Sequence, residues 1–107
     1  MIIDTRMRPM WGEFARQFTP GACAPFFRKI GMNMPESVQK SSEEDMIREM
    51  DEAGIAVGIA PSRFISNEHL TEMVEHFRGR FVGMASIDSA NSIRENLDIT
   101  RPYAVDG

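Results

Sequence analysis

The chain has 107 residues, of which 42% are hydrophobic and 26% charged, and its formal net charge is −4. These values are typical of one globular domain and exclude a disordered, collagen-like or disulfide-built protein. The acidic balance gives no basic surface for nucleic acid or an anionic membrane, and we expect neither partner. The sequence shows no signal peptide and no membrane anchor, and its single cysteine, Cys23, fits a reducing compartment, so cytoplasm is the expected location.

The first predicted element is a short strand at residues 2–7, which are β-prone and are followed by Pro9. Residues 9–40 form a long connection that Pro and Gly interrupt repeatedly, leaving room for short helical turns only at 13–18 and 26–30. The connection carries five aromatic side chains: Trp11, Phe14, Phe18, Phe26 and Phe27. This aromatic content predicts an ordered cover that packs on the rest of a single domain, 1–107.

A helix is predicted next, with Ser41 or Ser42 as its N-cap and acidic residues in its first turn. Apolar residues recur along it at helical spacing, and Gly54 is free to take the left-handed conformation that ends a helix. Residues 55–60 are continuously apolar, which is typical of a strand covered on both faces or placed in a closed sheet.

The same order then repeats. Ser66 caps a predicted helix at residues 67–78, and residues 81–87 form a third apolar strand. A last helix carries Ile93 and Leu97 and stops before Pro102. Three residues are alternative caps for it: Asp88, Ser89 and Ser92.

Strands that alternate with helices through short connections predict an α/β fold with a parallel βαβαβα unit whose strands are adjacent in chain order. Three such strands leave one sheet face bare and two edges unpaired. The chain is therefore a piece of a longer α/β protein, or it self-associates, or its last helix and the 9–40 connection fold over the sheet.

Candidate binding residues follow from this topology, because ligands of α/β folds gather at the carboxyl ends of the strands. Arg6, Arg8, Arg63 and Asp88 lie at these ends. Alternation along the first strand places Arg6 and Arg8 on one face, and forked guanidinium donors bind carboxylate or phosphate. In the alternative interpretation each arginine pairs with Asp4, Asp88 or a residue of the cover, and Asp88 is a helix cap rather than a base or a substrate-orienting group.

The remaining reactive side chains point to no catalytic set. His69 and His76 lie seven residues apart on one predicted helix, where we expect solvated or helix-face histidines rather than ligands. Cys23 can be a nucleophile only with a base beside it.

Residues 2–9, Ile-Ile-Asp-Thr-Arg-Met-Arg-Pro, resemble the first strand of the amidohydrolase superfamily, in particular its amidohydrolase-2 branch. Residues 46–58 and 67–88 are similar to the helices and strands that follow in that branch. The resemblance implies the first part of a TIM (β/α)8 barrel and a hydrolase or a carbon-carbon or carbon-oxygen lyase. The family opens with Ile-Asp-x-His-x-His, whose histidines bind a divalent metal, whereas this chain has Arg6 and Arg8. A guanidinium has no free lone pair for a cation, so we expect neither a metal nor another cofactor.

Two hypotheses follow. In the first, the chain is the N-terminal portion of an amidohydrolase-2-like barrel with a degenerate metal site, which binds a small carboxylate or phosphate near Arg6, Arg8, Arg63 and Asp88. An enzyme of this kind would be a metal-independent hydrolase or lyase that lacks a complete catalytic set in this chain. In the second, the chain is a non-catalytic truncated-barrel module. The expected partners are a small anion and either a second copy or the remainder of a barrel.

Overall fold

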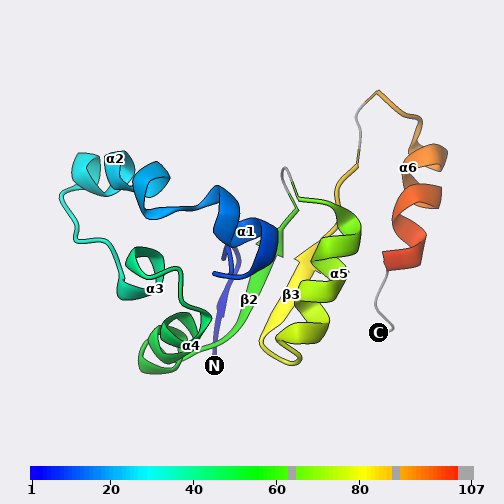
Figure 1. Ribbon diagram of the computed structural model, residues 1–107. Coiled ribbons are helices and arrows are strands. Elements are labelled where there is room, and N and C mark those ends of the chain that lie inside the picture. Colours follow the sequence, from blue (N-terminus) through cyan, green and yellow to red (C-terminus); the bar gives the residue numbers. More distant parts are fainter. Residues whose placement is uncertain (63–64, 88–89, 104–107) are drawn as a thin grey trace.

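The computed structural model describes residues 1–62, 65–87 and 90–103. In this part of the chain four α-helices follow the first strand, after which strands and helices alternate up to a short 3-10 helix, η1 (Figure 1). In chain order they are β1 (Ile2–Asp4), α1 (Gly12–Gln17), α2 (Pro20–Ile30), α3 (Glu36–Gln39), α4 (Glu43–Glu52), β2 (Ile55–Pro61), α5 (Asn67–His76), β3 (Phe81–Met84), α6 (Ile93–Thr100) and η1 (Arg101–Tyr103).

The strands form one parallel sheet in the order β1-β2-β3, which confirms the predicted topology. Ile3 pairs with Val57, and Gly58 pairs with Phe81. At the amino ends of the strands, the Arg80 side chain donates to the Ala56 and Ile55 carbonyls, at 3.0 Å in each case. The parallel register is therefore held by a side chain as well as by the backbone ladder.

Local capping explains where the helices begin. The Ser42 hydroxyl accepts a hydrogen bond of 3.2 Å from the Asp45 amide, and the Ser66 hydroxyl accepts one of 3.1 Å from the His69 amide. Ser92, rather than Asp88 or Ser89, is the N-cap of α6, in a reciprocal capping box with Glu95. The positions 88 and 89 themselves lie outside the described residues.

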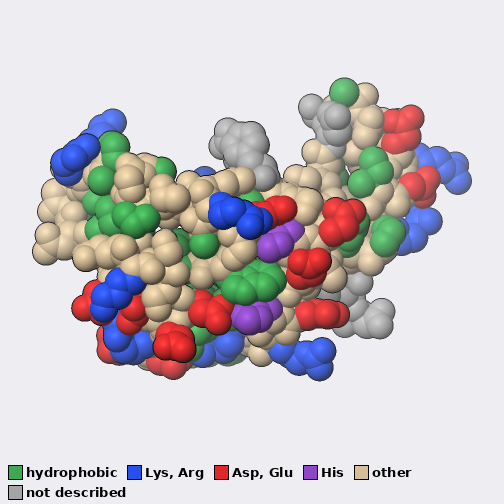
Figure 2. All heavy atoms as spheres, viewed as in Figure 1, with side chains coloured by type: hydrophobic (Ala, Val, Ile, Leu, Met, Phe, Trp, Pro, Cys, Tyr) green, Lys and Arg blue, Asp and Glu red, His purple; other side chains and the backbone are tan. Residues whose placement is uncertain are grey.

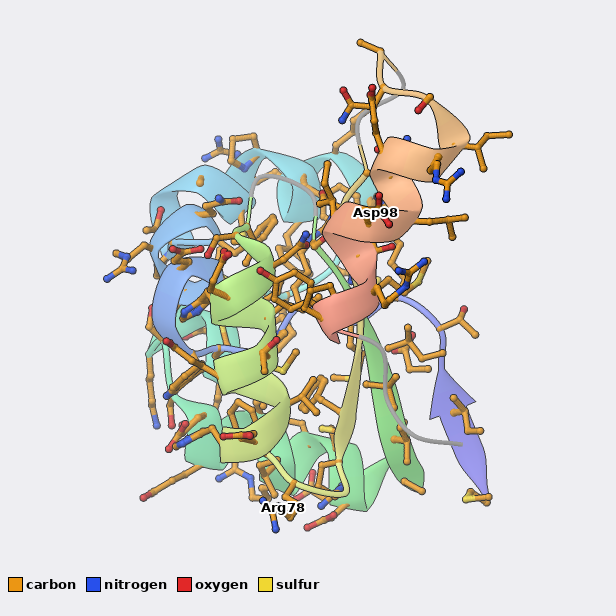
Figure 3. All side chains as sticks on the ribbon, turned by 90° about the vertical axis from the view of Figure 1, so that its right-hand side faces the viewer. Arg78 and Asp98 are labelled. Atoms are coloured by element: carbon orange, nitrogen blue, oxygen red, sulfur yellow. The ribbon has the colours of Figure 1, made fainter. Side chains whose placement is uncertain are left out.

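The core lies between one face of the sheet and the helices α1, α4 and α5 (Figure 3). Its most buried large side chains include Phe14, Met50, Met73 and Phe81. A Cβ on Gly83 would lie 2.6 Å from the Leu70 Cγ, so the missing side chain lets α5 approach β3 closely.

The opposite face of the sheet is open in the part of the chain that the structure describes. Alternation puts Val82 and Met84 there, because Phe81 and Gly83 face the core. Val82 is 43% and Met84 57% exposed, and Ile3, whose partner Val57 lies on the same face, is 50% exposed. This exposed apolar face is the bare face that the sequence predicts.

Three expected elements differ in length from those observed. β1 ends at Asp4 rather than at residue 7, because the Asp4 carboxylate accepts from the Arg6 amide at 3.0 Å and turns the chain. β3 ends at Met84 rather than at residue 87. The Ser86 amide donates a hydrogen bond of 2.8 Å to the Asn67 side chain instead of to a neighbouring strand. α5 ends at His76 rather than at 78.

The connection at 9–40 contains more helix than expected. It holds α1, α2 and α3. Helix α2 is 11 residues long and has Pro25 in its interior. Thr19 caps its start, Pro20 stands in the first turn where its missing N–H is no loss, and Gly31 ends it with φ +70°.

Candidate functional site

The residues that follow β1 were predicted to carry the site, and the structure gives them different surroundings. After the turn at Asp4, the Met7 amide donates to the Ile59 carbonyl at 2.9 Å, so the chain continues beside β2. Arg6 is exposed, whereas Arg8 is half-buried. The expectation of a continuous strand to residue 7 is therefore wrong, and the two arginines differ in exposure.

Arg8 is held against an aromatic ring of the 9–40 segment. Its guanidinium carbon lies 4.5 Å from the centroid of the Phe18 ring, which is a cation–π contact. A guanidinium presents forked N–H donors in the geometry that suits a carboxylate or phosphate. Stacking therefore fixes a permanent positive charge at the carboxyl end of β1.

Beside Arg8 lies a hollow of about 370 Å³ between the end of β1 and helices α2 and α3. The α3 wall is fixed to α4, because the Ser37 amide and hydroxyl both donate to the Glu49 carboxylate. Arg8 is the one charged side chain among the described residues that line the hollow. The others are apolar apart from a thiol: Met10, Phe18, Ala22, Cys23, Phe26, Phe27 and Val38.

Cys23 in this hollow is not an activated nucleophile. Burial raises the pKa of its thiol, and the positive charge of Arg8, which lowers this pKa, offsets only part of the effect. Neither His69 nor His76 lines the hollow, so no imidazole there can act as its base. Cys23 is accordingly a neutral thiol at pH 7.

Two of the predicted site residues, Arg63 and Asp88, lie outside the described residues. Ser62, the last described residue after β2, is buried, and its carbonyl accepts from the Ile65 amide at 2.9 Å. The structure thus describes the predicted site at the end of β1 alone.

The histidines are not solvated as a pair. The Trp11 ring stacks between His69 and His76, at centroid distances of 5.0 and 4.6 Å. Figure 2 shows the two purple histidines with a hydrophobic side chain between them and acidic side chains nearby. His69 is only 11% exposed and accepts from the Glu13 amide at 3.0 Å. Both residues lie on one face of α5, as expected, and of the two His69 is shielded from solvent.

The described residues do not fit the metal centre that the family resemblance implies. Arg6 and Arg8 occupy the positions of its first two ligands, and Arg8 packs on Phe18. In residues 1–62, 65–87 and 90–103, no group of three or more His, Cys, Asp or Glu side chains is arranged to hold a metal ion. The same part of the chain has no helix of the length and apolarity that a bilayer crossing requires.

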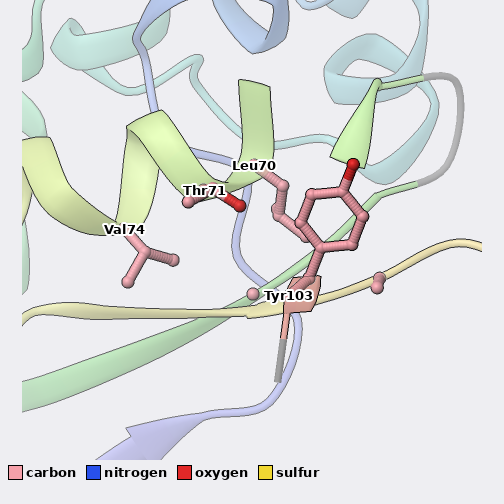
Figure 4. Close-up of a pocket in the computed structure, with 6 residues that line it drawn as sticks. Leu70, Thr71, Val74 and Tyr103 are labelled. Carbon is pink, nitrogen blue, oxygen red and sulfur yellow. The ribbon is translucent and has the colours of Figure 1, made fainter. Parts of the chain in front are cut away.

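A smaller cavity of about 70 Å³ lies between α5, β3 and Tyr103 (Figure 4). Leu70, Thr71 and Val74 contribute its α5 wall, and the Tyr103 ring closes one side. Its volume is well below the roughly 300 Å³ at which small-molecule sites begin. The hollow beside Arg8 is therefore the better candidate.

No protein-family model matches the sequence, and no curated protein does. A solved structure, that of the uncharacterised TIM-barrel protein Bb4693 from Bordetella bronchiseptica, is similar to the chain with a TM-score of 0.77 and 27% sequence identity. The similarity covers 94% of this chain and 39% of that chain. The parallel sheet with its helices is thus an incomplete TIM barrel, and the hollow beside Arg8 adjoins the carboxyl end of its first strand.

Proposed function

We propose that the chain is the N-terminal portion of an amidohydrolase-2-like barrel with a degenerate metal site, and that it binds a small carboxylate or phosphate at the carboxyl ends of its strands. Sites of TIM-barrel proteins lie at this end of the barrel. In this proposal Arg8 and Arg6 attract the anion, Arg63 and Asp88 complete the site, and residues 9–40 act as its cover within one domain, 1–107.

The observation that supports the proposal most directly is the placement of Arg8. Its stack on Phe18 holds the guanidinium at the border of a 370 Å³ hollow. A fixed fork loses less conformational freedom on binding than a mobile side chain does, so it binds an anion with a smaller entropic penalty. Arg6 is exposed and supplies a second positive charge near the same strand end.

The proposed role of this chain is binding rather than a complete reaction. Cys23 is a neutral thiol, and the two described imidazoles are stacked on Trp11. A hydrolase or lyase reaction, as the family resemblance suggests, would take its base from elsewhere. The chain spans 39% of the length of Bb4693, so the activity of a whole barrel is itself a proposal.

The test is a calorimetric titration with phosphate and with acetate. Arg8→Gln should weaken binding about tenfold, because a charge-assisted hydrogen bond contributes roughly 1.5 kcal/mol or more. Arg94→Gln, an exposed arginine of α6, is the matched control and should leave affinity unchanged. Equal anion affinity in the parent and in an Arg6→Gln, Arg8→Gln double variant would refute the proposal.

A second candidate is a non-catalytic module that associates with its own copies. The exposed apolar face of the sheet, with Ile3, Val82 and Met84, favours it. Such faces are normally covered in parallel sheets.

A further inference from the structure

The hollow beside Arg8 has an uneven chemistry. One charged group, the Arg8 guanidinium, stands among one thiol and apolar side chains of α2, of α3 and of the residues on either side of α1. Phe26 and Phe27 of α2 meet edge to face, with their ring centroids 5.4 Å apart, and both rings border the hollow. The rings give the hollow a broad apolar wall on the side of α2.

The volume of the hollow also limits its ligand. About 370 Å³ lies within the range of small-molecule sites, whereas a bare phosphate or acetate would leave most of this space to water. Water against Phe26, Phe27 and Val38 is unfavourable compared with an apolar group in the same place. A ligand that fills the hollow therefore carries more than its anionic head.

From this placement we infer that the hollow binds a monocarboxylate with an apolar body, whose head pairs with Arg8 and whose body contacts Phe26 and Phe27. The inference rests on the proposed function, because it takes Arg8 as the anion-binding group, and it adds the class of ligand. Arg8 is the one charged residue among the described residues of the lining, so the part of the ligand that enters the hollow carries a single anionic group.

A neighbouring hollow is a poorer site for the same ligand. It measures about 220 Å³ and shares Arg8, Met10 and Val38 with the larger one. It also borders Glu49, whose carboxylate accepts from Ser37. A negative charge so placed repels an anionic head, so the carboxylate is expected on the side of Arg8 that faces Phe26.

The experiment is a calorimetric titration of the whole chain with acetate, butanoate, hexanoate and octanoate, and with neutral octanol, all below their aggregation concentrations. Affinity should increase along the series by up to about fourfold per methylene, which corresponds to ~0.8 kcal/mol for each CH₂ buried. Octanol should bind at least about tenfold more weakly than octanoate, because it lacks the charge that pairs with Arg8.

Two exposed positions of α2 supply matched variants. Phe26, 59% exposed, borders the hollow, whereas Ile30, 46% exposed, does not. Phe26→Ser should weaken octanoate about fivefold and leave acetate unchanged, since a half-exposed ring offers about half of its full burial to the ligand. Ile30→Ser should change neither. Octanoate should also slow alkylation of Cys23, the one cysteine of the chain.

The outcomes separate the two ideas. If acetate and octanoate bind equally and both depend on Arg8, the proposed anion site stands and the apolar-bodied ligand is wrong. If octanoate and octanol bind equally in the parent and in Arg8→Gln, both are wrong. If Ile30→Ser and Phe26→Ser weaken the binding of octanoate alike, the inference is also contradicted, because the ligand would then lie on the outside of α2.

Discussion

Trp11 shows how one residue can join distant segments. Its ring lies between two imidazoles of α5 and meets the edge of Phe77. His69 accepts a hydrogen bond from the Glu13 amide, and the His76 ring lies 2.8 Å from the Glu43 carboxylate at the start of α4. The stack thus connects α1, α4 and α5 through side chains that carry no chemistry of their own at the proposed site.

The two histidines should contribute unequally to stability. His69→Ala removes the acceptor of the Glu13 amide together with a stacking partner, and should destabilise the fold by about 2 kcal/mol. His76→Ala removes a stack and an exposed hydrogen bond to Glu43 and should cost about 1 kcal/mol. Urea denaturation measures both. Equal losses would mean that the Glu13 hydrogen bond contributes no more to stability than the contact between His76 and Glu43.

At the residue scale, the sequence predicted where Arg6 and Arg8 lie in the fold but not what they touch. Their position after the first strand followed from the α/β topology. The partner of Arg8 did not, because Phe18 lies in a segment whose helices were only partly predicted. The histidine stack was similarly hidden. The seven-residue spacing places both rings on one face, but nothing local indicates that Trp11 fills the space between them.

At the scale of elements, α6 and η1 form the least embedded part of the described chain. None of their residues is buried, and Leu97 is 54% exposed. A hydrogen bond of 2.6 Å from the Tyr103 hydroxyl to Glu68 attaches η1 to α5. This bond lowers the pKa of Glu68 and raises that of Tyr103, since it favours the carboxylate and the neutral phenol.

The attachment of η1 should therefore depend on pH at both extremes. The contribution of Glu68 to the stability of this attachment is present above its ordinary pKa, and it is lost as the pH falls through the lowered pKa of the folded state. That of Tyr103 is present below its ordinary pKa and is lost as the pH rises through its raised folded value. The absorbance of tyrosinate follows this residue alone, because the chain has one tyrosine.

Glu68→Gln tests the same bond. It should move the titration of Tyr103 back toward the ordinary value, while Glu75→Gln, an exposed change on the same helix, should not. An unchanged titration in Glu68→Gln would show that the two side chains are not bonded in solution.

Helix boundaries were predictable where caps are local. Ser42, Ser66 and Ser92 each precede an amphipathic run, and each is an observed N-cap. α2 was underestimated because Gly21 and Pro25 count as helix breakers, although Thr19 and Gly31 bound a helix that tolerates both. Strand ends were less predictable, because side chains such as Asn67 replace the ladder beyond β3.

For the whole molecule, the open face of the sheet is the surface on which the proposed self-association depends. In a closed barrel this face would line the interior. In the described part of the chain its side chains Val82 and Met84 are exposed. Burial of these side chains against a second copy would stabilise a dimer, which is the alternative to the remainder of a barrel.

Sedimentation velocity over a range of concentrations tests self-association. If the face mediates it, Val82→Lys should raise the dimer dissociation constant at least tenfold, because it would bury an unpaired charge and ~1.4 kcal/mol corresponds to a factor of ten. Ile93→Lys, on the 82% exposed Ile93 of α6, is the control and should leave the constant unchanged. A parent chain that stays monomeric at every concentration contradicts the module.

The unequal crossovers have a consequence for the order of assembly. β1 ends at Asp4 and β2 begins at Ile55, whereas β2 and β3 are separated only by α5 and its turns. Closing the longer loop costs more chain entropy, so we expect the β2–α5–β3 unit to form first and the amino-terminal strand to dock last. Arg8 would then reach its place only at that final step. A ligand bound to Arg8 would therefore also stabilise the amino-terminal strand against local opening.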